Sequence, residues 1–364
     1  MTDARPRPLP AIAGLAPYRQ GKIALDDVAQ PLKLSSNESM LGPSPRALEA
    51  YRALASDLQL YPDGSQSALR AAIGEVHGID PDRIVCGNGS DELIQLLIRT
   101  YAGPGDDVVL SQYSFAMAFV HSIAQGANAI SVAEPGLRPD VDGLLAALTP
   151  NTRMVVLASP NNPVGQYLPR DELTRLHAGL PGDVILLLDS AYADYVDAPD
   201  YEAGAALVGA HDNVVMTRTF SKLYGLAGLR IGWMYAPRAI IDMVQRIRTP
   251  FNGNAAALAA AEAAVRDVDY AAMVRAENNA ELARIAKALD LAGIEVIPSS
   301  ANFYLVRFPA AGRDPEGAAH YLEARGIIPR PVSAGGPEAA LRISVGRPHQ
   351  NDRVIQTLMD YMAS

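Results

Sequence analysis

Short apolar runs recur along the first two thirds of the chain, and each ends in polar residues or in glycine or proline. They lie at residues 84–86, 108–110, 154–158, 184–188 and 214–216. Near-continuous apolar runs of this length, separated by segments with helical periodicity, are typical of parallel strands buried on both faces of a sheet. The pattern therefore predicts an α/β fold with a mostly parallel sheet between helices.

The segments between these runs predict the helices of such a sheet. Ser90 is a suitable N-cap for a helix over residues 91–101, in which leucine and isoleucine form one side and two acidic residues favour the positive helix start. Residues 144–148, 171–177 and 239–248 predict further crossover helices. The length of 364 residues suits two domains better than one.

The character of the sequence changes after the Pro-Phe-Asn-Gly segment that ends at residue 253. Alanine-rich and charge-patterned sequence predicts a long helix from 255 to about 291. Strand signals at 294–297, 303–308 and 341–345 and a helix at 317–325 predict a smaller α+β domain. We therefore expect an amino-terminal segment that packs with the small domain, a large domain and a small carboxy-terminal domain, at residues 1–50, 51–255 and 256–364.

Composition and charge exclude several classes of protein. The 31 lysines and arginines are outnumbered by 40 aspartates and glutamates, so we expect neither nucleic acid nor a membrane surface as partner. No apolar stretch approaches the roughly 20 residues of a membrane span. The single cysteine and a beginning without the apolar core of a signal peptide predict a cytoplasmic protein. The six histidines lack metal-ligand spacing, so no metal site is predicted.

Three of the predicted strands end in polar side chains that a purely structural loop does not need. Asn162 follows the strand at 154–158, Asp189 and Tyr192 follow the next strand, and Lys222 follows the last one. Ligands of parallel α/β sheets bind at the carboxyl ends of the strands. We therefore expect these four side chains to converge on one site.

The four residue types match the needs of pyridoxal 5'-phosphate (PLP). A desolvated lysine amine becomes a nucleophile toward a carbonyl group. An aspartate at an apolar strand end can keep a pyridine nitrogen protonated, and a tyrosine with an asparagine can bind a phenolate oxygen. A lone lysine is more often a surface residue, so the prediction depends on the four residues together.

Two segments are candidates to hold the phosphate of this cofactor. The glycine pair at 87 and 89 opens a helix, so the N–H groups of Ser90 and Asp91 can face an anion at the positive helix end. An ordinary turn with an N-cap explains that glycine pair equally well. The second segment contains Thr219, Ser221 and Arg230, whose guanidinium can bind phosphate as a fork.

Together these motifs resemble a known family. The most specific is Thr-Phe-Ser-Lys, ending at Lys222, with Arg230 following eight residues later. Further matching stretches lie at 34–38, 60–64, 87–92, 159–165, 189–192, 217–233, 301–303 and 341–346. The chain resembles the PLP-dependent aminotransferases of fold type I and, within them, the histidinol-phosphate aminotransferase branch.

The resemblance implies roles around the cofactor ring. Lys222 would form an imine with PLP and then transfer a proton, and Asp189 would pair with the pyridine nitrogen. Tyr192 and Asn162 would bind the 3'-oxygen, and Tyr113 would stack on the ring.

It also implies how the cofactor phosphate is held. Ser90, Asp91, Thr219, Ser221 and Arg230 would bind it within one subunit. Tyr61 would reach the phosphate of the neighbouring subunit, which implies a homodimer with shared active sites.

The resemblance further implies a small-molecule amino donor and a keto-acid acceptor. Arg342 would meet the carboxylate or phosphate of the substrate, Arg330 would support a substrate phosphate, and Tyr18 is a further candidate. The implied reaction is transamination between L-histidinol phosphate and 2-oxoglutarate in histidine biosynthesis.

The family's Asn-Glu-Asn-Pro, Pro-Thr-Gly and Asp-Glu-Ala-Tyr motifs are altered here at Ser39–Met40, Val164 and Ser190. Met40 and Leu41 belong to a segment that lines the substrate pocket in the family. An aromatic amino-acid aminotransferase therefore remains an alternative. A decarboxylase of phosphorylated amino acids and a non-enzymatic ligand-binding protein are the other two.

Overall fold

The computed structural model describes residues 6–18, 20–26, 28–308, 313–332 and 340–364. Its helices are α1 (Pro10–Ala13), α2 (Pro45–Ala53), α3 (Ser67–His77), α4 (Gly89–Tyr101), α5 (Ala116–Ala124), α6 (Val141–Ala146), α7 (Arg170–Ala178), α8 (Ala205–Ala210), α9 (Arg238–Ile247), α10 (Ala255–Arg266), α11 (Val268–Leu291), α12 (Pro315–Glu323) and α13 (Pro348–Ala363). The strands of the larger sheet are β2 (Ile84–Gly87), β3 (Asp107–Ser111), β4 (Asn128–Val132), β5 (Thr152–Ala158), β6 (Ile185–Asp189), β7 (Val214–Thr219) and β8 (Gly232–Tyr235). The remaining strands are β1 (Leu32–Lys33), β9 (Glu295–Ile297), β10 (Phe303–Arg307), β11 (Ile327–Ile328), β12 (Arg330–Val332) and β13 (Ala340–Ser344).

The larger sheet has seven strands in the order β2-β8-β7-β6-β5-β3-β4. Only β8 runs antiparallel to its neighbours, so the prediction of a mostly parallel sheet is confirmed. All five predicted strands are present. The sequence did not predict β4, an edge strand with exposed polar residues, or β8, which has only four residues.

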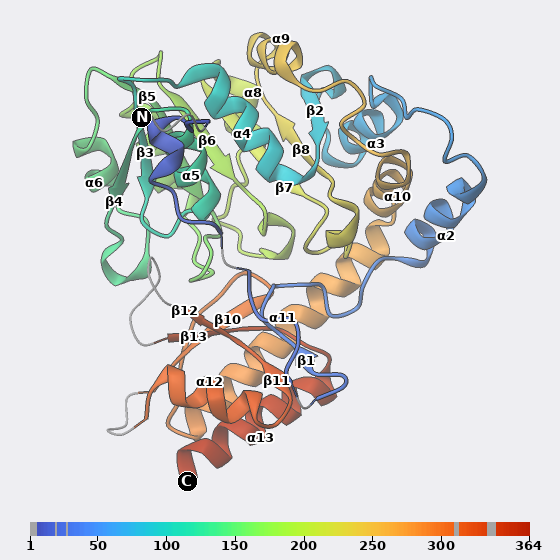
Figure 1. Ribbon diagram of the computed structural model, residues 1–364, viewed down its shortest axis with the longest axis vertical. Coiled ribbons are helices and arrows are strands. Elements are labelled where there is room, and N and C mark those ends of the chain that lie inside the picture. The colour runs from blue at the N-terminus through green and yellow to red at the C-terminus, as the bar shows by residue number, and fades with distance from the viewer. Residues whose placement is uncertain (1–5, 19, 27, 309–312, 333–339) are drawn as a thin grey trace.

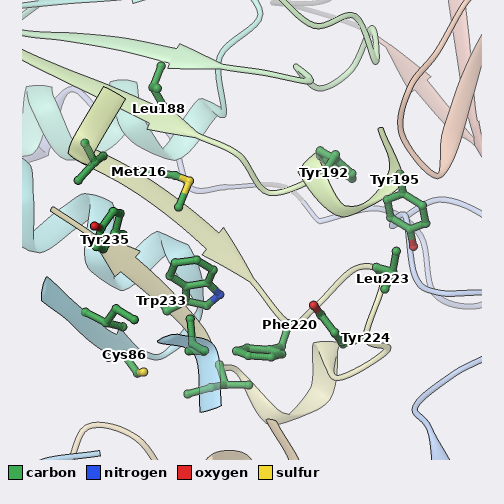
Figure 2. Close-up of a cluster of buried hydrophobic side chains, with 14 of the residues drawn as sticks. Cys86, Leu188, Tyr192, Tyr195, Met216, Phe220, Leu223, Tyr224, Trp233 and Tyr235 are labelled. Atoms are coloured by element: carbon green, nitrogen blue, oxygen red, sulfur yellow. The ribbon is translucent and has the colours of Figure 1, made fainter. Parts of the chain in front are cut away.

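Both faces of this sheet are buried, which explains why its strands are apolar at successive positions. Along β6, Leu186 and Leu188 belong to one core cluster, and Ile185 and Leu187 belong to the cluster on the opposite face. Figure 2 shows part of the first cluster, in which Trp233 is almost fully buried. Helices α4, α5 and α9 supply residues packed on the second face.

The prediction of one continuous helix over residues 255–291 is wrong. The chain forms two helices, α10 and α11, and Asp267 between them has a non-helical ψ of 63°. Helix α10 packs on α2 and α3, whereas α11 packs on α13 and β9. The helix axis must change direction between these two sets of partners, and no glycine or proline marks the change in the sequence.

The smaller lobe lies below the large sheet in Figure 1 and contains the antiparallel sheet β12-β13-β10-β9. The amino-terminal segment joins it, because β1 pairs in parallel with β11, and Leu34 is part of its core. Helix α1 contacts α5 of the large lobe instead. The domain boundaries expected near residues 50 and 255 remain a prediction. In the part of the chain that the structure describes, no helix has the length and hydropathy to cross a membrane.

Candidate active site

The polar residues that follow β5, β6 and β7 line one cavity of about 190 Å³ at the carboxyl edge of the large sheet. The switch from parallel to antiparallel pairing at β7 and β8 lies beside it. Nine residues singled out from the sequence line this cavity: Ser90, Asp91, Asn162, Asp189, Tyr192, Thr219, Ser221, Lys222 and Arg230. The fold brings these residues together from strand ends, loops and the start of α4, since they are spread over 140 positions (90 to 230) of the chain.

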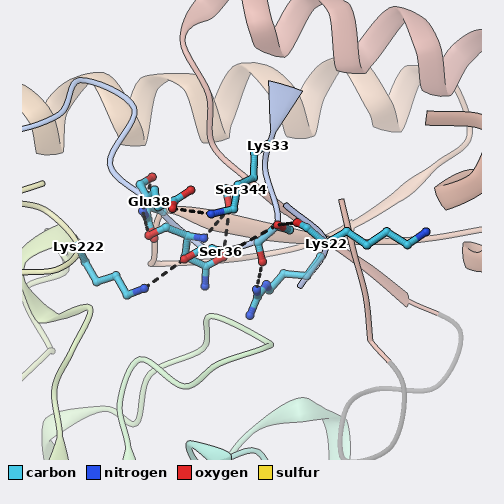
Figure 3. A network of polar contacts seen from close by, with 10 residues as sticks. Lys22, Lys33, Ser36, Glu38, Lys222 and Ser344 are labelled. Carbon is cyan, nitrogen blue, oxygen red and sulfur yellow. Dashed lines mark hydrogen bonds and ion pairs between the residues drawn. The ribbon is translucent and has the colours of Figure 1, made fainter. Parts of the chain in front are cut away.

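Lys222 extends from the end of β7 toward the amino-terminal segment. Its Nζ donates a hydrogen bond of 3.3 Å to the backbone oxygen of Ser36, as Figure 3 shows. The same Nζ lies 5.6 Å from the centre of the Tyr192 ring. The amine is therefore held at the junction of the large lobe and the segment that packs with the small lobe.

Asp189 is the buried carboxylate of the cavity and is 6% exposed. Burial raises its pKa to about 6, although hydrogen bonds from Thr217 and from the Ala191 N–H lower it. The charge of Lys222 also lowers this pKa. A cationic ring nitrogen beside Asp189 would stabilise the charged carboxylate that burial disfavours.

The start of α4 and the end of β7 form an anion cradle. A Cβ atom at Gly232 would lie 2.5 Å from the backbone nitrogen of Ser90, so only glycine lets β8 approach the helix start this closely. Arg230 adopts the left-handed conformation (φ 55°) and donates from Nη1 to Ser221 Oγ at 3.2 Å. The start of α4, the hydroxyl groups of Ser90, Thr219 and Ser221, and the Arg230 guanidinium therefore line one space, which fits a phosphate.

Tyr192 is oriented by a residue that the sequence analysis did not assign to the site. The side-chain amide of Asn37 donates to the Tyr192 hydroxyl oxygen at 2.9 Å. Asn37 itself has a positive φ of 54° and receives support from Ser344, whose hydroxyl accepts its backbone N–H at 2.8 Å. The Tyr192 oxygen accepts this hydrogen bond. Its O–H can therefore donate a hydrogen bond to a ligand oxygen.

Arg342 joins the small lobe to the cavity. Its Nη1 donates to Asn162 Oδ1 at 2.5 Å and its Nη2 to the Ser35 backbone oxygen at 2.6 Å. Burial lowers the pKa of Arg342, and the charge of Arg330 lowers it further, while Tyr192 and Tyr18 raise it. Among the described residues, the buried Nε of Arg342 has no hydrogen-bond partner.

Arg330 and Tyr18 lie near Arg342. Arg330 is the cross-strand partner of Arg342 in the β12–β13 pair. Two guanidinium groups on neighbouring strands make this region attractive to an anionic ligand. Tyr18 is 64% exposed. The substrate-binding roles expected for the three residues remain predictions.

Two aromatic residues that the sequence predicts for the site, Tyr113 and Tyr61, are not part of the cavity lining. Tyr113 is buried with Val164 and Leu305, whereas Phe115, two residues later, lines the cavity. Tyr61 is 84% exposed and stacks on Phe251 with ring centres 4.8 Å apart. The stacking role expected for Tyr113 and the role of Tyr61 in a neighbouring subunit remain predictions.

The cavity offers no cluster of metal ligands. Within the described ranges, no three His, Cys, Asp or Glu side chains come together in a way that could hold a metal ion. The donor set consists instead of one amine, one buried carboxylate, hydroxyl groups and a phosphate cradle. This set defines an enzyme that holds a phosphorylated cofactor beside a reactive lysine.

Comparison with known proteins gives the family. Residues 29–358 match the family model described as aminotransferase class I and II. The chain is 47% identical over 357 residues to the histidinol-phosphate aminotransferase of Rhodospirillum centenum, covering 98% of this chain and 99% of that one. It is 46% identical to the enzyme of the same name from Paramagnetospirillum magneticum, with 99% of each chain covered. The chain belongs to the class I and II aminotransferases.

A solved structure supports the same assignment. The crystal structure of histidinol-phosphate aminotransferase from Sinorhizobium meliloti in complex with pyridoxal-5'-phosphate is 28% identical and superimposes with a TM-score of 0.90. The match covers 100% of this chain and 99% of that one. The predicted fold type is therefore confirmed over the whole chain.

Proposed function

We propose that the chain is a PLP-dependent aminotransferase that exchanges the amino group between L-histidinol phosphate and 2-oxoglutarate in histidine biosynthesis. The observation that carries the proposal is the 46–47% identity to enzymes of that name over nearly the whole chain. The convergence of nine expected cofactor residues on one cavity supports it independently.

The residues of the cavity fit PLP by their chemistry. When bound, the cofactor supplies an electron-withdrawing ring that stabilises negative charge at the carbon from which a proton leaves. Asp189 would keep a proton on the ring nitrogen, and Tyr192 and Asn162 would bind the oxygen at the 3' position. The hydroxyl groups of Thr219 and Ser221 would bind the phosphate.

Lys222 is the side chain that would hold the cofactor and move the proton. Its amine lines the cavity, donates the 3.3 Å bond to the Ser36 oxygen and lies over the Tyr192 ring. In its neutral form, the Lys222 amine would act as a general base for the hydrogen on the substrate carbon. It can return that proton to a neighbouring atom without an additional catalytic group.

Arg342 and Arg330 bind the anionic group of the donor. Arg342 is partly buried and donates to Asn162 Oδ1, so it would couple substrate binding to a residue at the cofactor. Arg330 contributes a second positive charge one strand away. A phosphate, with two negative charges near neutral pH, gains more from this pair than a single carboxylate does.

A homodimer is part of the proposal, since Tyr61 is exposed where a second subunit could use it. We also place the enzyme in the cytoplasm, where the substrates of amino-acid biosynthesis are found.

The test is a panel of single half-reactions with the PLP-loaded protein. L-histidinol phosphate, phenylalanine, tyrosine and glutamate are mixed separately with the enzyme, and the change in cofactor absorption is followed. We expect L-histidinol phosphate to react fastest and L-histidinol, which lacks the phosphate, to react at least about tenfold more slowly. Lys222→Ala should bind PLP but show no conversion.

Other outcomes identify the alternatives. Faster conversion by phenylalanine or tyrosine would make the chain an aromatic amino-acid aminotransferase. Release of carbon dioxide from a phosphorylated amino acid without a keto acid would make it a decarboxylase. Failure of the pure protein to acquire a cofactor absorption band would contradict the enzyme assignment.

A further inference from the structure

A buried carboxylate outside the cavity connects the loops that follow β3 and β5. Glu134 lies just after β4 and is 4% exposed. Its Oε1 accepts hydrogen bonds from the Ser111 hydroxyl and from the Tyr113 N–H, the latter at 3.0 Å. Its Oε2 accepts a bond of 2.9 Å from the side-chain amide of Asn161. One side chain thus holds three loops of the carboxyl edge together.

Both oxygens of Glu134 have to be acceptors. The backbone N–H of Gln166 donates to Asn161 Oδ1 at 3.1 Å, which fixes the orientation of the Asn161 amide and turns its NH₂ group toward Glu134. The Tyr113 N–H is a backbone donor and cannot become an acceptor. A glutamine at position 134 would therefore turn its NH₂ group either toward the Asn161 NH₂ or toward the Tyr113 N–H. In both orientations, two donors would face each other.

The two loops that Glu134 connects carry groups of the cavity. Asn161 precedes Asn162, which lines the cavity and accepts a hydrogen bond from Arg342. Tyr113 lies two residues before Phe115, which also lines the cavity. A small displacement of either loop would move a cavity side chain away from the cofactor.

The loop held through Asn161 also contacts the small lobe. The side-chain amide of Gln166 donates to the Pro298 backbone oxygen at 2.6 Å, and the Ser300 N–H donates to the Gly165 oxygen at 2.8 Å. These bonds join the β5 loop to the segment between β9 and β10. The position of Glu134 therefore affects both the cavity and the contact between lobes.

We infer that Glu134 is a positioning residue that aligns Asn162 and Phe115 with the cofactor by binding the β3 loop to the β5 loop. The inference rests on the proposed function, because it assigns Glu134 a role at the PLP site. Glu134 touches neither cofactor nor substrate and acts through Asn161 and Tyr113.

The first variant is Glu134→Gln. It keeps the shape of the side chain and removes one acceptor, so Asn161 or Tyr113 faces a second donor. We expect the dissociation constant of PLP to rise about tenfold or more, because a buried donor loses its partner. In the cofactor-free protein, amide hydrogen exchange at Tyr113 and Gln166 should accelerate.

A second substitution tests the mechanism by exchanging the two groups. In the double variant Glu134→Gln with Asn161→Asp, the carboxylate stands at position 161 and the amide at position 134. The new amide can donate to the new carboxylate, whose other oxygen still accepts from Gln166 N–H. We expect PLP affinity within about twofold of the wild type and slow amide exchange, since every donor again has an acceptor.

The matched control is Asp107, a buried carboxylate at the opposite end of β3. It accepts hydrogen bonds from the Asn128 side chain at 2.8 Å and from the Thr149 hydroxyl at 2.5 Å. Asp107→Asn should lower the thermal stability of the protein but leave the PLP dissociation constant unchanged. A purely structural role of Glu134 predicts the same result for both variants.

Three results would overturn the inference: wild-type PLP affinity in Glu134→Gln, equal loss of affinity in Asp107→Asn, or no recovery in the double variant. If the wild-type protein does not bind PLP, the proposed function fails. The role of Glu134 is then decided by amide hydrogen exchange at Tyr113 and Gln166, and unchanged exchange in Glu134→Gln overturns the inference. If Glu134→Gln does not fold, Asn161→Ala cuts the same connection on one side, and unchanged PLP affinity in that variant overturns the inference.

Discussion

Asp189 shows how burial sets the protonation of a single residue in this site. Its folded pKa of about 6 lies above the ordinary aspartate value of 3.8, and burial is the largest cause. The folded protein therefore binds a proton more tightly than the unfolded chain does. In the cofactor-free protein, the carboxylate therefore lowers the free energy of unfolding progressively as pH rises from about 4 to about 6. At higher pH this loss of stability is complete and stays constant.

Asp189→Asn should consequently stabilise the cofactor-free protein in a pH-dependent way. The substitution removes the destabilisation caused by the buried charge, so the free energy of unfolding should rise by on the order of 3 kcal/mol at pH 7.5 and by roughly half of that at pH 5. Urea unfolding at the two pH values measures the difference, which we expect to be about 1.4 kcal/mol. The same variant should bind PLP more weakly, because the partner of the ring nitrogen is lost.

The exposed Asp212 provides the control for this experiment. Asp212→Asn should change the free energy of unfolding by less than about 0.5 kcal/mol at either pH. An Asp189→Asn effect of the same size at pH 5 and pH 7.5 would show that the residue is charged throughout, contrary to its raised pKa.

Residues next to strand ends could be predicted, whereas residues that act from distant loops could not. Lys222 and Asp189 follow strands with clear apolar patterns, so the rule for parallel sheets places them at one edge. Asn37 reaches Tyr192 across 155 positions of the chain, and no local pattern signals that contact. Phe115 has no local signal either, since its loop is bonded to a residue further along the chain, through the Tyr113 N–H and Glu134, 21 positions apart.

The contact between β8 and the start of α4 is a feature of two elements. A Cβ atom at Gly232 would lie 2.5 Å from Ser90 N, 2.7 Å from Gly89 C and 2.8 Å from the Arg218 backbone oxygen. All three are backbone atoms, so no side-chain rotation can relieve the overlap. The strand and the helix start would have to separate.

Gly232→Ala should therefore destabilise the fold by about 1–3 kcal/mol and weaken PLP binding, because the N–H groups of α4 move away from the phosphate. Denaturant unfolding and a PLP titration measure the two effects. Gly209→Ala in α8 is the matched control, since nothing lies within 4 Å of its added methyl group. It should be neutral or stabilise the protein by up to about 1 kcal/mol. Equal PLP affinity in both variants would contradict the proposal that the close approach of β8 to the start of α4 forms the phosphate site.

At the level of the whole molecule, the site is complete only when the large lobe, the amino-terminal segment and the small lobe are together. Figure 3 shows Lys222 of the large lobe bonded to Ser36 of the amino-terminal segment, with Ser344 of the small lobe in the same network. Ser344 Oγ accepts from the Asn37 N–H, and its hydroxyl donates to Asn37 Oδ1 at 3.2 Å. A change in the position of the small lobe would therefore reach Tyr192 through Asn37.

Exposed apolar side chains gather on the segment around Tyr61. Leu58 is 75% exposed, Leu60 is 64% exposed, and Tyr61 stacks on the half-exposed Phe251. Large exposed apolar side chains in one segment are typical of an interface. They support the proposed homodimer, in which Tyr61 serves the neighbouring active site.

Leu60→Asp should produce a monomer with little or no transaminase activity, because a charge would be buried at the interface and Tyr61 could no longer reach a partner. Light scattering after size exclusion, together with the half-reaction panel, measures both properties. Leu291, which is 82% exposed on α11, is the control. Leu291→Asp should leave mass and activity unchanged. A dimeric, active Leu60→Asp protein would contradict the proposed interface.

The sequence by itself determined the parallel sheet, the residues at its carboxyl edge and the family, because apolar periodicity and motif spacing are local properties of the chain. The turn at Asp267, the unpredicted strand β8 and the contacts of Asn37 and Glu134 were decided only by the tertiary structure. Each depends on partners far away in the sequence: α10 packs on α2 and α3, α11 packs on α13 and β9, and Glu134 binds residues 23 and 27 positions away. Packing and hydrogen-bond complementarity between such segments exist only once the chain has folded.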